Sequence, residues 1–79
     1  MKLTYDPKYN IAYIKFRNKT SQVKTISLSA EVNIDLSADG KIAGIELLNA
    51  NEQLRTSGNN LSFVNELTGD KLEMPLQGV

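Results

Sequence analysis

The sequence predicts a mainly β fold, with an antiparallel meander of about five strands, one short helix near residues 49–55 and a C-terminal β-hairpin. Apolar and polar residues alternate with period two through the first 48 residues, which is typical of half-buried strands. Turn-forming residues separate these runs, and helix formers gather between residues 49 and 55. We therefore expect one small β-rich domain over residues 1–79, with the meander at 1–48 and the helix and hairpin at 49–79.

The five strands of the meander are expected at residues 2–5, 11–16, 23–29, 32–36 and 41–48. The second strand places Ala12, Ile14 and Phe16 on one face. Ile11 and Tyr13 occupy the other face. Because both faces carry large apolar groups, we expect this strand to be central in the sheet or to have protein against each side.

The third and fourth strands each show one apolar face. Ile26 and Leu28 form that face in the third strand, and Val32, Ile34 and Leu36 form it in the fourth. Strict alternation makes the fourth strand the clearest strand signal in the chain.

A tight hairpin is expected at Asp39-Gly40, a dipeptide that favours two-residue turns. In the strand that follows, the alternation slips between Ile42 and Ile45, and Gly44 lies inside the slip. A β-bulge produces such a slip, so we expect one here.

The C-terminal part begins with Asn49, a candidate helix cap, followed by helix formers up to Arg55. Two further alternating runs follow at residues 61–66 and 71–76, separated by a Thr-Gly-Asp turn. Pro75 indicates an edge strand, because proline has no backbone N–H to donate. We expect a terminal hairpin, and whether it is exchanged with a second subunit is left open.

Composition limits how such a chain can be stabilised and what it can catalyse. The 79 residues include no His, no Cys and no Trp. A chain of this size buries only ~60% of the surface exposed by its unfolded form, so many small domains need a disulfide, a metal or a second subunit. Without Cys or His, a disulfide and the usual zinc ligands and general base are excluded. Self-association or an oxygen-ligand cation remains, and we expect no enzymatic activity and no cofactor.

The net charge of zero conceals a strong asymmetry. Residues 1–24 hold six Lys and Arg against one Asp, whereas residues 25–79 hold three against eight carboxylates. This pattern fits a basic binding face, or two regions that neutralise each other within or between chains. An ordinary solvated surface of mixed charge is the alternative.

The first 50 or so residues resemble a family of short, uncharacterised prokaryotic proteins that share a conserved domain of unknown function. The similar stretches are residues 2–7, 12–16, 34–36, 39–40 and 44–50. The chain departs from the pattern at Asn10, where an acidic residue is usual, and in its longer C-terminal hairpin. The resemblance implies a small β-rich fold, no known activity and no functional residues to assign. Genes of this type can sit beside small toxin-like proteins, which implies a small protein partner.

Residues 35–46 match the spacing of a calcium-binding EF-hand loop. The candidate ligands would be Asp35, Ser37, Asp39 and Glu46. An EF-hand loop follows a helix, whereas the preceding residues alternate like a strand. We therefore favour a strand, an Asp-Gly turn and a second strand, with Asp35 and Glu46 facing solvent, and expect no metal site.

A basic, aromatic segment around the second strand is the candidate for nucleic-acid contact. Its cations are Lys8, Lys15, Arg17 and Lys19. Single-stranded RNA binds sheets through exposed aromatics and nearby cations, but the Gly-flanked aromatic signature of such proteins is missing here. A pI near 6.2 also argues against a dedicated nucleic-acid binder.

The function that we predict is a non-enzymatic protein-interaction module that forms a homodimer. The predicted interface residues are Ile11, Tyr13, Phe63 and Met74. The longest apolar runs are about four residues and the N-terminus has no apolar core of a signal peptide, so we expect a cytoplasmic protein without a membrane segment. The alternatives are a nucleic-acid-associated accessory protein and a calcium-binding module.

Overall fold

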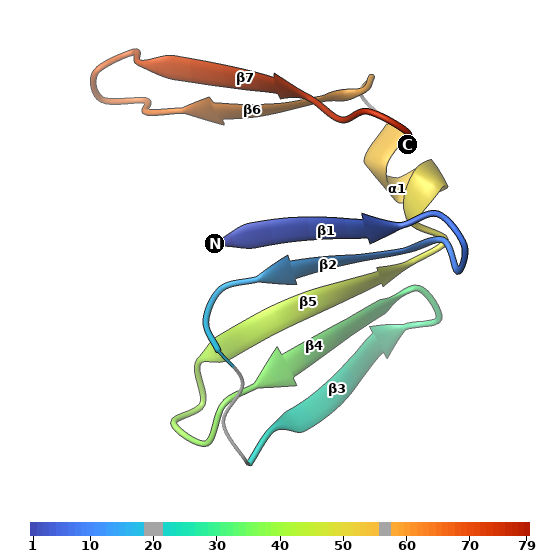
Figure 1. The fold of residues 1–79 in the computed structure, drawn as a ribbon. Helices are drawn as coiled ribbons and strands as arrows, with labels where there is room; N and C mark the ends of the chain where they lie inside the picture. The colour runs from blue at the N-terminus through green and yellow to red at the C-terminus, as the bar shows by residue number, and fades with distance from the viewer. Residues whose placement is uncertain (19–21, 56–57) are drawn as a thin grey trace.

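A computed structural model of the chain describes residues 1–18, 22–55 and 58–79. Its elements, in chain order, are β1 (Lys2–Asp6), β2 (Ile11–Lys15), β3 (Lys24–Ser29), β4 (Val32–Leu36), β5 (Ile42–Leu48), α1 (Ala50–Arg55), β6 (Asn60–Val64) and β7 (Lys71–Pro75) (Figure 1). The mainly β class, the short helix and the C-terminal hairpin predicted from the sequence are confirmed.

The first five strands form one antiparallel sheet in the order β1-β2-β5-β4-β3 (Figure 1). The predicted meander order is therefore wrong, because β5 lies between β2 and β4. Alternation reports which face a side chain occupies, but it says nothing about which backbone pairs with which. A connection of this length, residues 16–23, spans up to about 26 Å when fully extended. The far edge of the sheet is only about 14 Å from β2, so the connection is long enough to place β3 there.

Strand pairing brings apolar residues that are distant in sequence into continuous rows. Opposite partners in neighbouring strands give a central row across all five strands, made of Leu3, Ile14, Ile45, Ile34 and Ile26. A second row on the same face holds Tyr5, Ala12, Leu47 and Val32. These two rows are the apolar face of the sheet. Side chains alternate between faces along a strand, so the residues between them form the opposite, polar face.

Two irregularities interrupt the pairing. Between β4 and β5, Asp35 pairs with Gly44 and Leu36 with Ile42, which leaves Ala43 as the extra residue and confirms the predicted bulge. Between β3 and β4 the register skips Leu28, which is 60% exposed. Leu28 therefore has no directly opposite partner in β4, and the prediction that it shares a face with Ile26 stays a prediction.

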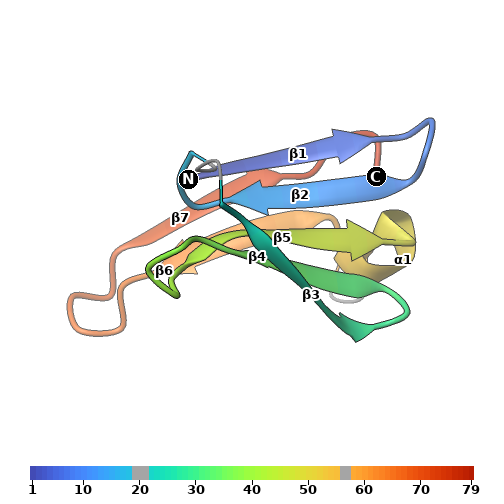
Figure 2. The ribbon, with the colours of Figure 1, turned by 90° about the horizontal axis from the view of Figure 1, so that it is seen from below.

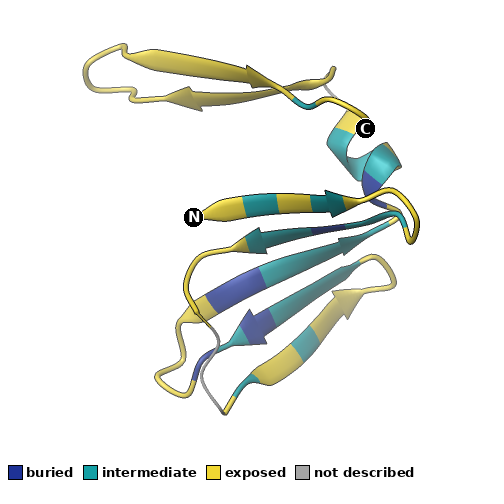
Figure 3. Cartoon of the chain, in the orientation of Figure 1, coloured by how far each residue is buried: buried dark blue, intermediate teal, exposed yellow. Residues whose placement is uncertain are grey.

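The interior of this chain is very small. Among the described residues, the buried apolar ones are Ala12, Ala43 and Ala50, and no large side chain is fully buried (Figure 3). Three alanines bury too little apolar area to form an ordinary hydrophobic core. The apolar face is therefore incompletely covered within one chain.

Helix α1 is attached to one end of the sheet through Asn10, the last residue of the β1–β2 turn. Asn10 adopts a left-handed φ of 55°, and its backbone carbonyl accepts a hydrogen bond from Ala50 N (3.0 Å). Its side chain accepts from Asn51 N and donates to Asn51 Oδ1, both at 2.8 Å. Gln53 donates to the carbonyls of Glu31 and Leu48. These bonds fix where the chain leaves the sheet.

Strands β6 and β7 pair only with each other and form the C-terminal hairpin, which lies apart from the sheet beyond β1 (Figure 1). All residues of both strands are exposed. The sheet itself is twisted, so β3 runs at a clear angle to β1 (Figure 2). Within the described ranges, no helix has the length and apolar character needed to cross a bilayer.

Candidate interaction surface

The apolar face of the sheet is only partly covered. All five side chains of its central row are only half-buried. In an antiparallel sheet one face normally packs on a core and the other meets water. Here the described elements form no second layer over the face that should pack on a core (Figure 3). This face is therefore the candidate interaction surface of the sheet.

The C-terminal hairpin carries a second apolar surface. Leu61 pairs with Met74, and Phe63 pairs with Leu72, so the four side chains share one side of the hairpin. Phe63 and Leu72 are each 67% exposed, and Met74 is 53% exposed. We call these four residues the apolar hairpin side. An isolated two-stranded hairpin is marginal in water, so this side also needs a covering layer.

The four predicted interface residues lie in two different places. Phe63 and Met74 belong to the apolar hairpin side. Ile11 and Tyr13 lie on the polar face of the sheet, opposite the apolar rows. Their role in an interface stays a prediction. The central row was not singled out from the sequence, because its members become neighbours only through pairing, although the alternation around Ile14 and Ile34 marks their face.

On the polar face, a hydrogen-bonded network links three strands. The Tyr13 hydroxyl donates to Asp35 Oδ2 at 2.7 Å, and the Thr25 hydroxyl donates to Asp35 Oδ1 at 2.6 Å. Asp35 is only 8% exposed. A buried carboxylate is costly unless it accepts hydrogen bonds, and these two donors from β2 and β3 supply them.

Gly44 makes this network possible. It lies on β5 between the strands of Tyr13 and Asp35, and the space that a Cβ would take is occupied by the Tyr13 hydroxyl and ring. Beside this network, Asn33 donates to Glu46 Oε1 at 2.9 Å. The polar face is thus tied together by side-chain bonds across β2, β3, β4 and β5.

The four candidate calcium ligands do not come together as a metal site. Asp35 is bonded to Tyr13 and Thr25, and Glu46 to Asn33. Asp39 accepts from Arg17 at 3.0 Å and from the backbone N–H of Lys41. No group of three or more potential ligands that could hold a metal ion is found in the described part of the chain. The preceding segment is strand β4, as favoured, but the expectation that Asp35 faces solvent is wrong, because Asp35 is 8% exposed and accepts hydrogen bonds from Tyr13 and Thr25.

Electrostatic effects at this end of the sheet are modest. The backbone N–H of Lys41 lowers the pKa of Asp39 below its ordinary value of 3.8, desolvation opposes this, and the guanidinium of Arg17 lowers the pKa further. The Arg17–Asp39 ion pair is solvent-exposed. Exposed pairs of this kind contribute little stability.

The candidate nucleic-acid cations are spread along β2 and the two loops that flank it. Lys8 lies over the Tyr9 ring, with its Nζ 5.3 Å from the ring centroid. Lys15 stands opposite Lys2 across the β1–β2 pair, and Arg17 is paired with Asp39. Lys19 lies outside the described residues. Two facing lysines repel each other, so this end of β1 and β2 favours an anionic neighbour.

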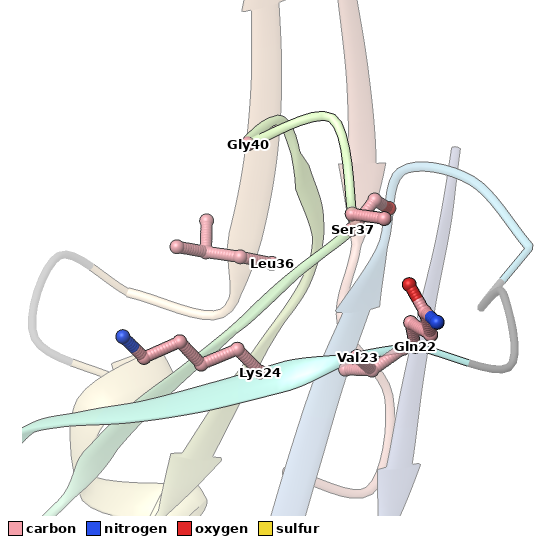
Figure 4. Close-up of a pocket in the computed structure, with 7 residues that line it drawn as sticks. Gln22, Val23, Lys24, Leu36, Ser37 and Gly40 are labelled. Atoms are coloured by element: carbon pink, nitrogen blue, oxygen red, sulfur yellow. The ribbon is translucent and has the colours of Figure 1, made fainter.

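A shallow pocket of about 420 Å³ lies between the start of β3 and the β4–β5 turn (Figure 4). Its described lining residues are Gln22, Val23, Lys24, Leu36, Ser37, Ala38 and Gly40. The Ser37 hydroxyl is buried and has no hydrogen-bond partner among the described residues. The side chains of Gln22 and Ser37 lie on one side of the pocket, and those of Lys24 and Leu36 extend to the other (Figure 4). The described lining residues offer one cation, Lys24, and one hydroxyl, that of Ser37.

A protein-family model matches the part of the chain that forms the sheet. The model of a family described as "Protein of unknown function (DUF2283)" matches residues 2–51, from the start of β1 to the start of α1. The match confirms the predicted resemblance to a family without assigned activity, and it covers the whole five-stranded sheet. No curated protein and no solved structure matched the chain.

Proposed function

The chain belongs to the family described as protein of unknown function (DUF2283), and we propose that it acts as a non-enzymatic protein-interaction module that forms a homodimer. The observation that carries this proposal is the half-exposed central row of the apolar face, beside which the buried apolar residues of the described part of the chain are three alanines. A sheet with such a face is stable only when a second layer covers it.

The energetic reason is the area that one chain leaves exposed. Each Å² of apolar surface removed from water contributes about 25 cal/mol, and a fully buried Ile or Leu side chain contributes about 1.5–3 kcal/mol. A second layer over the central row therefore supplies the part of the folding free energy that a single chain lacks. The central row consists of Leu3, Ile14, Ile26, Ile34 and Ile45. Folding and association are then coupled, as in many small obligate dimers.

A second copy is the partner that this surface favours. Dimers with twofold symmetry are the commonest protein assemblies, because one self-complementary patch is used twice. The opposite charges of residues 1–24 and 25–79 add attraction between two antiparallel copies. A small protein of another kind would have to compete with the second copy for the same face.

The non-enzymatic part of the proposal has its support in composition and geometry. A chain without His and Cys lacks the side chains that most often act as base or nucleophile near neutral pH. The buried carboxylate of Asp35 is engaged by Tyr13 and Thr25. These bonds link strands, which is a structural role.

The proposal is tested by the mass of the particle in solution and by one matched pair of variants. Sedimentation velocity should give a dimer at micromolar concentration. Leu3→Asp places a charge in the central row at the edge strand β1, whereas Thr4→Asp places it on the adjacent exposed position of the polar face. We expect Leu3→Asp to weaken the dimer and Thr4→Asp to leave it intact.

Ile26→Asp repeats the test at the other edge of the sheet, with Ser27→Asp as its control, in case Leu3→Asp does not fold. Circular dichroism checks the folding of each variant. A wild-type monomer that persists at every accessible concentration would disprove the homodimer. Equal effects of the apolar-face and polar-face variants would show that the dimer forms elsewhere.

Nucleic-acid binding remains a second candidate because of one observation, the facing pair Lys2 and Lys15. Phosphates would relieve their repulsion. A gel shift with single-stranded RNA at two salt concentrations tests this, since binding driven by phosphates must weaken steeply as salt rises. Lys15→Gln should reduce the shift, and an unchanged shift would remove the candidate.

A further inference from the structure

We propose that the apolar face of one copy is covered by the C-terminal hairpin of a second copy, so that the two chains exchange hairpins. This inference rests on the proposed homodimer and names the segment that forms its interface. The hairpin can serve as the apolar layer that the face needs. Its apolar side presents Leu61, Phe63, Leu72 and Met74 on two paired strands. Its five-residue strands match β1, β2 and β4 in length.

Within one copy the two apolar surfaces do not meet. All residues of β6 and β7 are exposed, and the hairpin lies apart from the sheet (Figures 1 and 3). The helix that carries the hairpin is fixed to the end of the sheet by the bonds between Asn10 and Asn51 and by those of Gln53. The helix is thus attached to the end of the sheet, whereas the described residues of the hairpin lie apart from the sheet.

Net charge favours the encounter of the hairpin with the sheet of another copy, and Lys2, Lys15 and Glu73 lie on the faces turned away from the two apolar surfaces. The exposed hairpin and its turn hold three carboxylates, Glu66, Asp70 and Glu73, against one lysine, Lys71. The strands β1 and β2 with their turn hold Lys2, Lys8 and Lys15 against Asp6. Complementary charges of this kind steer association and fix orientation more than they add affinity. Two like hairpins, or two like sheet edges, would instead repel each other.

Exchange of hairpins would cover the apolar face of the sheet and the apolar hairpin side in the same contact. In a twofold dimer the hairpin of each copy covers the face of the other, and the same contact forms twice. Packing of the apolar hairpin side against Ile14, Ile34 and Ile45 would give the second layer that the centre of the sheet lacks, at the spacing of about 10 Å between packed sheets.

The direct test is an isotope-filtered NMR experiment on a mixed dimer. Labelled and unlabelled wild-type chains are unfolded together in urea and refolded as a mixture. We expect cross-peaks between the Phe63 ring or the Met74 methyl of one copy and the methyl groups of Ile14, Ile34 and Ile45 of the other. The experiment uses the full chain, and the cross-peaks arise from residues that have not been substituted.

Each other outcome of this experiment overturns the exchange in a distinct way. Hairpin-to-sheet contacts found only within one copy would show that the hairpin folds back on its own sheet. Filtered contacts between the isoleucines of two copies would show that two sheets pack face to face. In both cases a homodimer could persist, so the exchange would fail without the proposed function. A monomeric wild type would disprove both.

A matched pair of hairpin variants gives an independent measurement. Phe63→Asp alters the apolar hairpin side, whereas Val64→Asp alters an exposed apolar residue on the opposite side of the same strand. We expect Phe63→Asp to raise the dimer dissociation constant about 100-fold, as for a central anchor residue, and Val64→Asp to change it less than about threefold. Equal dissociation constants for the two variants would contradict the exchange.

Discussion

The ring of Tyr13 crosses the backbone of Gly44 and places its hydroxyl 2.7 Å from Asp35 Oδ2. Gly44 belongs to the central strand β5, and its φ is outside the left-handed region, so its role is to leave space. A single missing Cβ thus allows a side chain on β2 to reach a carboxylate on β4 across an intervening strand. This arrangement explains how a nearly buried aspartate is tolerated on the polar face.

Gly44→Ala should destabilise the fold by about 1–3 kcal/mol, because the new methyl group displaces the Tyr13 ring and removes one hydrogen bond from Asp35. Urea denaturation of the single variant and of the same change in a Tyr13→Ala background measures the effect. The cost of Gly44→Ala should shrink in that background. An equal cost in both backgrounds would show that the two residues are not coupled.

Tyr13→Phe should lower the free energy of unfolding by about 1–3 kcal/mol, since it removes only the hydroxyl that donates to a buried carboxylate. Tyr9→Phe is the matched control, because Tyr9 is 65% exposed. Thermal or urea unfolding compares the two. A loss as small for Tyr13→Phe as for Tyr9→Phe would mean that the bond to Asp35 contributes nothing to stability.

Asp39 should contribute to a loss of stability in acid. Its pKa is lowered in the folded chain, first by the Lys41 backbone N–H and then by Arg17. A depressed pKa stabilises the fold above the unfolded value, here 3.8, and this contribution disappears as the pH falls through the lower folded value. Melting temperatures from pH 2 to 6 should therefore fall less steeply in Asp39→Asn.

Two further variants separate the causes of that shift. Arg17→Gln should flatten part of the acid dependence, whereas Lys41→Gln should leave it unchanged because the backbone N–H remains. If Lys41→Gln flattens the curve as strongly as Asp39→Asn does, the lysine side chain and not its backbone is responsible.

Asn10→Ala should loosen helix α1 at its first turn. Alanine at a φ of 55° is strained by about 1–2 kcal/mol, and the side-chain bonds to Asn51 are lost. Asn10→Asp should have a smaller effect, since aspartate tolerates this φ and keeps the oxygen that accepts from Asn51 N. Hydrogen exchange of the Asn51 amide measures the loosening. Similar exchange rates in the two variants would argue against the side-chain acceptor.

Most of the elements could be predicted from the sequence because strands and turns are encoded locally. The alternation around Ile34 and the Asp39-Gly40 turn located β4 and the start of β5, and the slip at Gly44 indicated the bulge that pairing confirms. The bulge at Leu28 in β3 was not predicted from the sequence. The residues around this bulge, Ser27 and Ser29, are both small and polar, so the shift between faces leaves no slip of apolar residues in the sequence.

Of the candidate sites, only the hairpin residues were placed on an apolar surface by sequence reasoning. Phe63 and Met74 could be found because the two strands of a hairpin pair in a register set by their turn. Ile11 and Tyr13 were selected for their apolar character, but the pairing of β2 places them on the polar face. The buried state of Asp35 depends on donors 10 and 22 residues away, which no local pattern reveals.

The sequence by itself determined that this is a small β-rich chain with a terminal hairpin, no Cys or His, and opposite charges in its two parts. The tertiary structure alone decided that β5 lies between β2 and β4, and with it which apolar residues form one row. The physical reason is that strands pair through backbone groups that every residue shares. Only the paired sheet therefore shows an apolar face that a single chain leaves half-exposed.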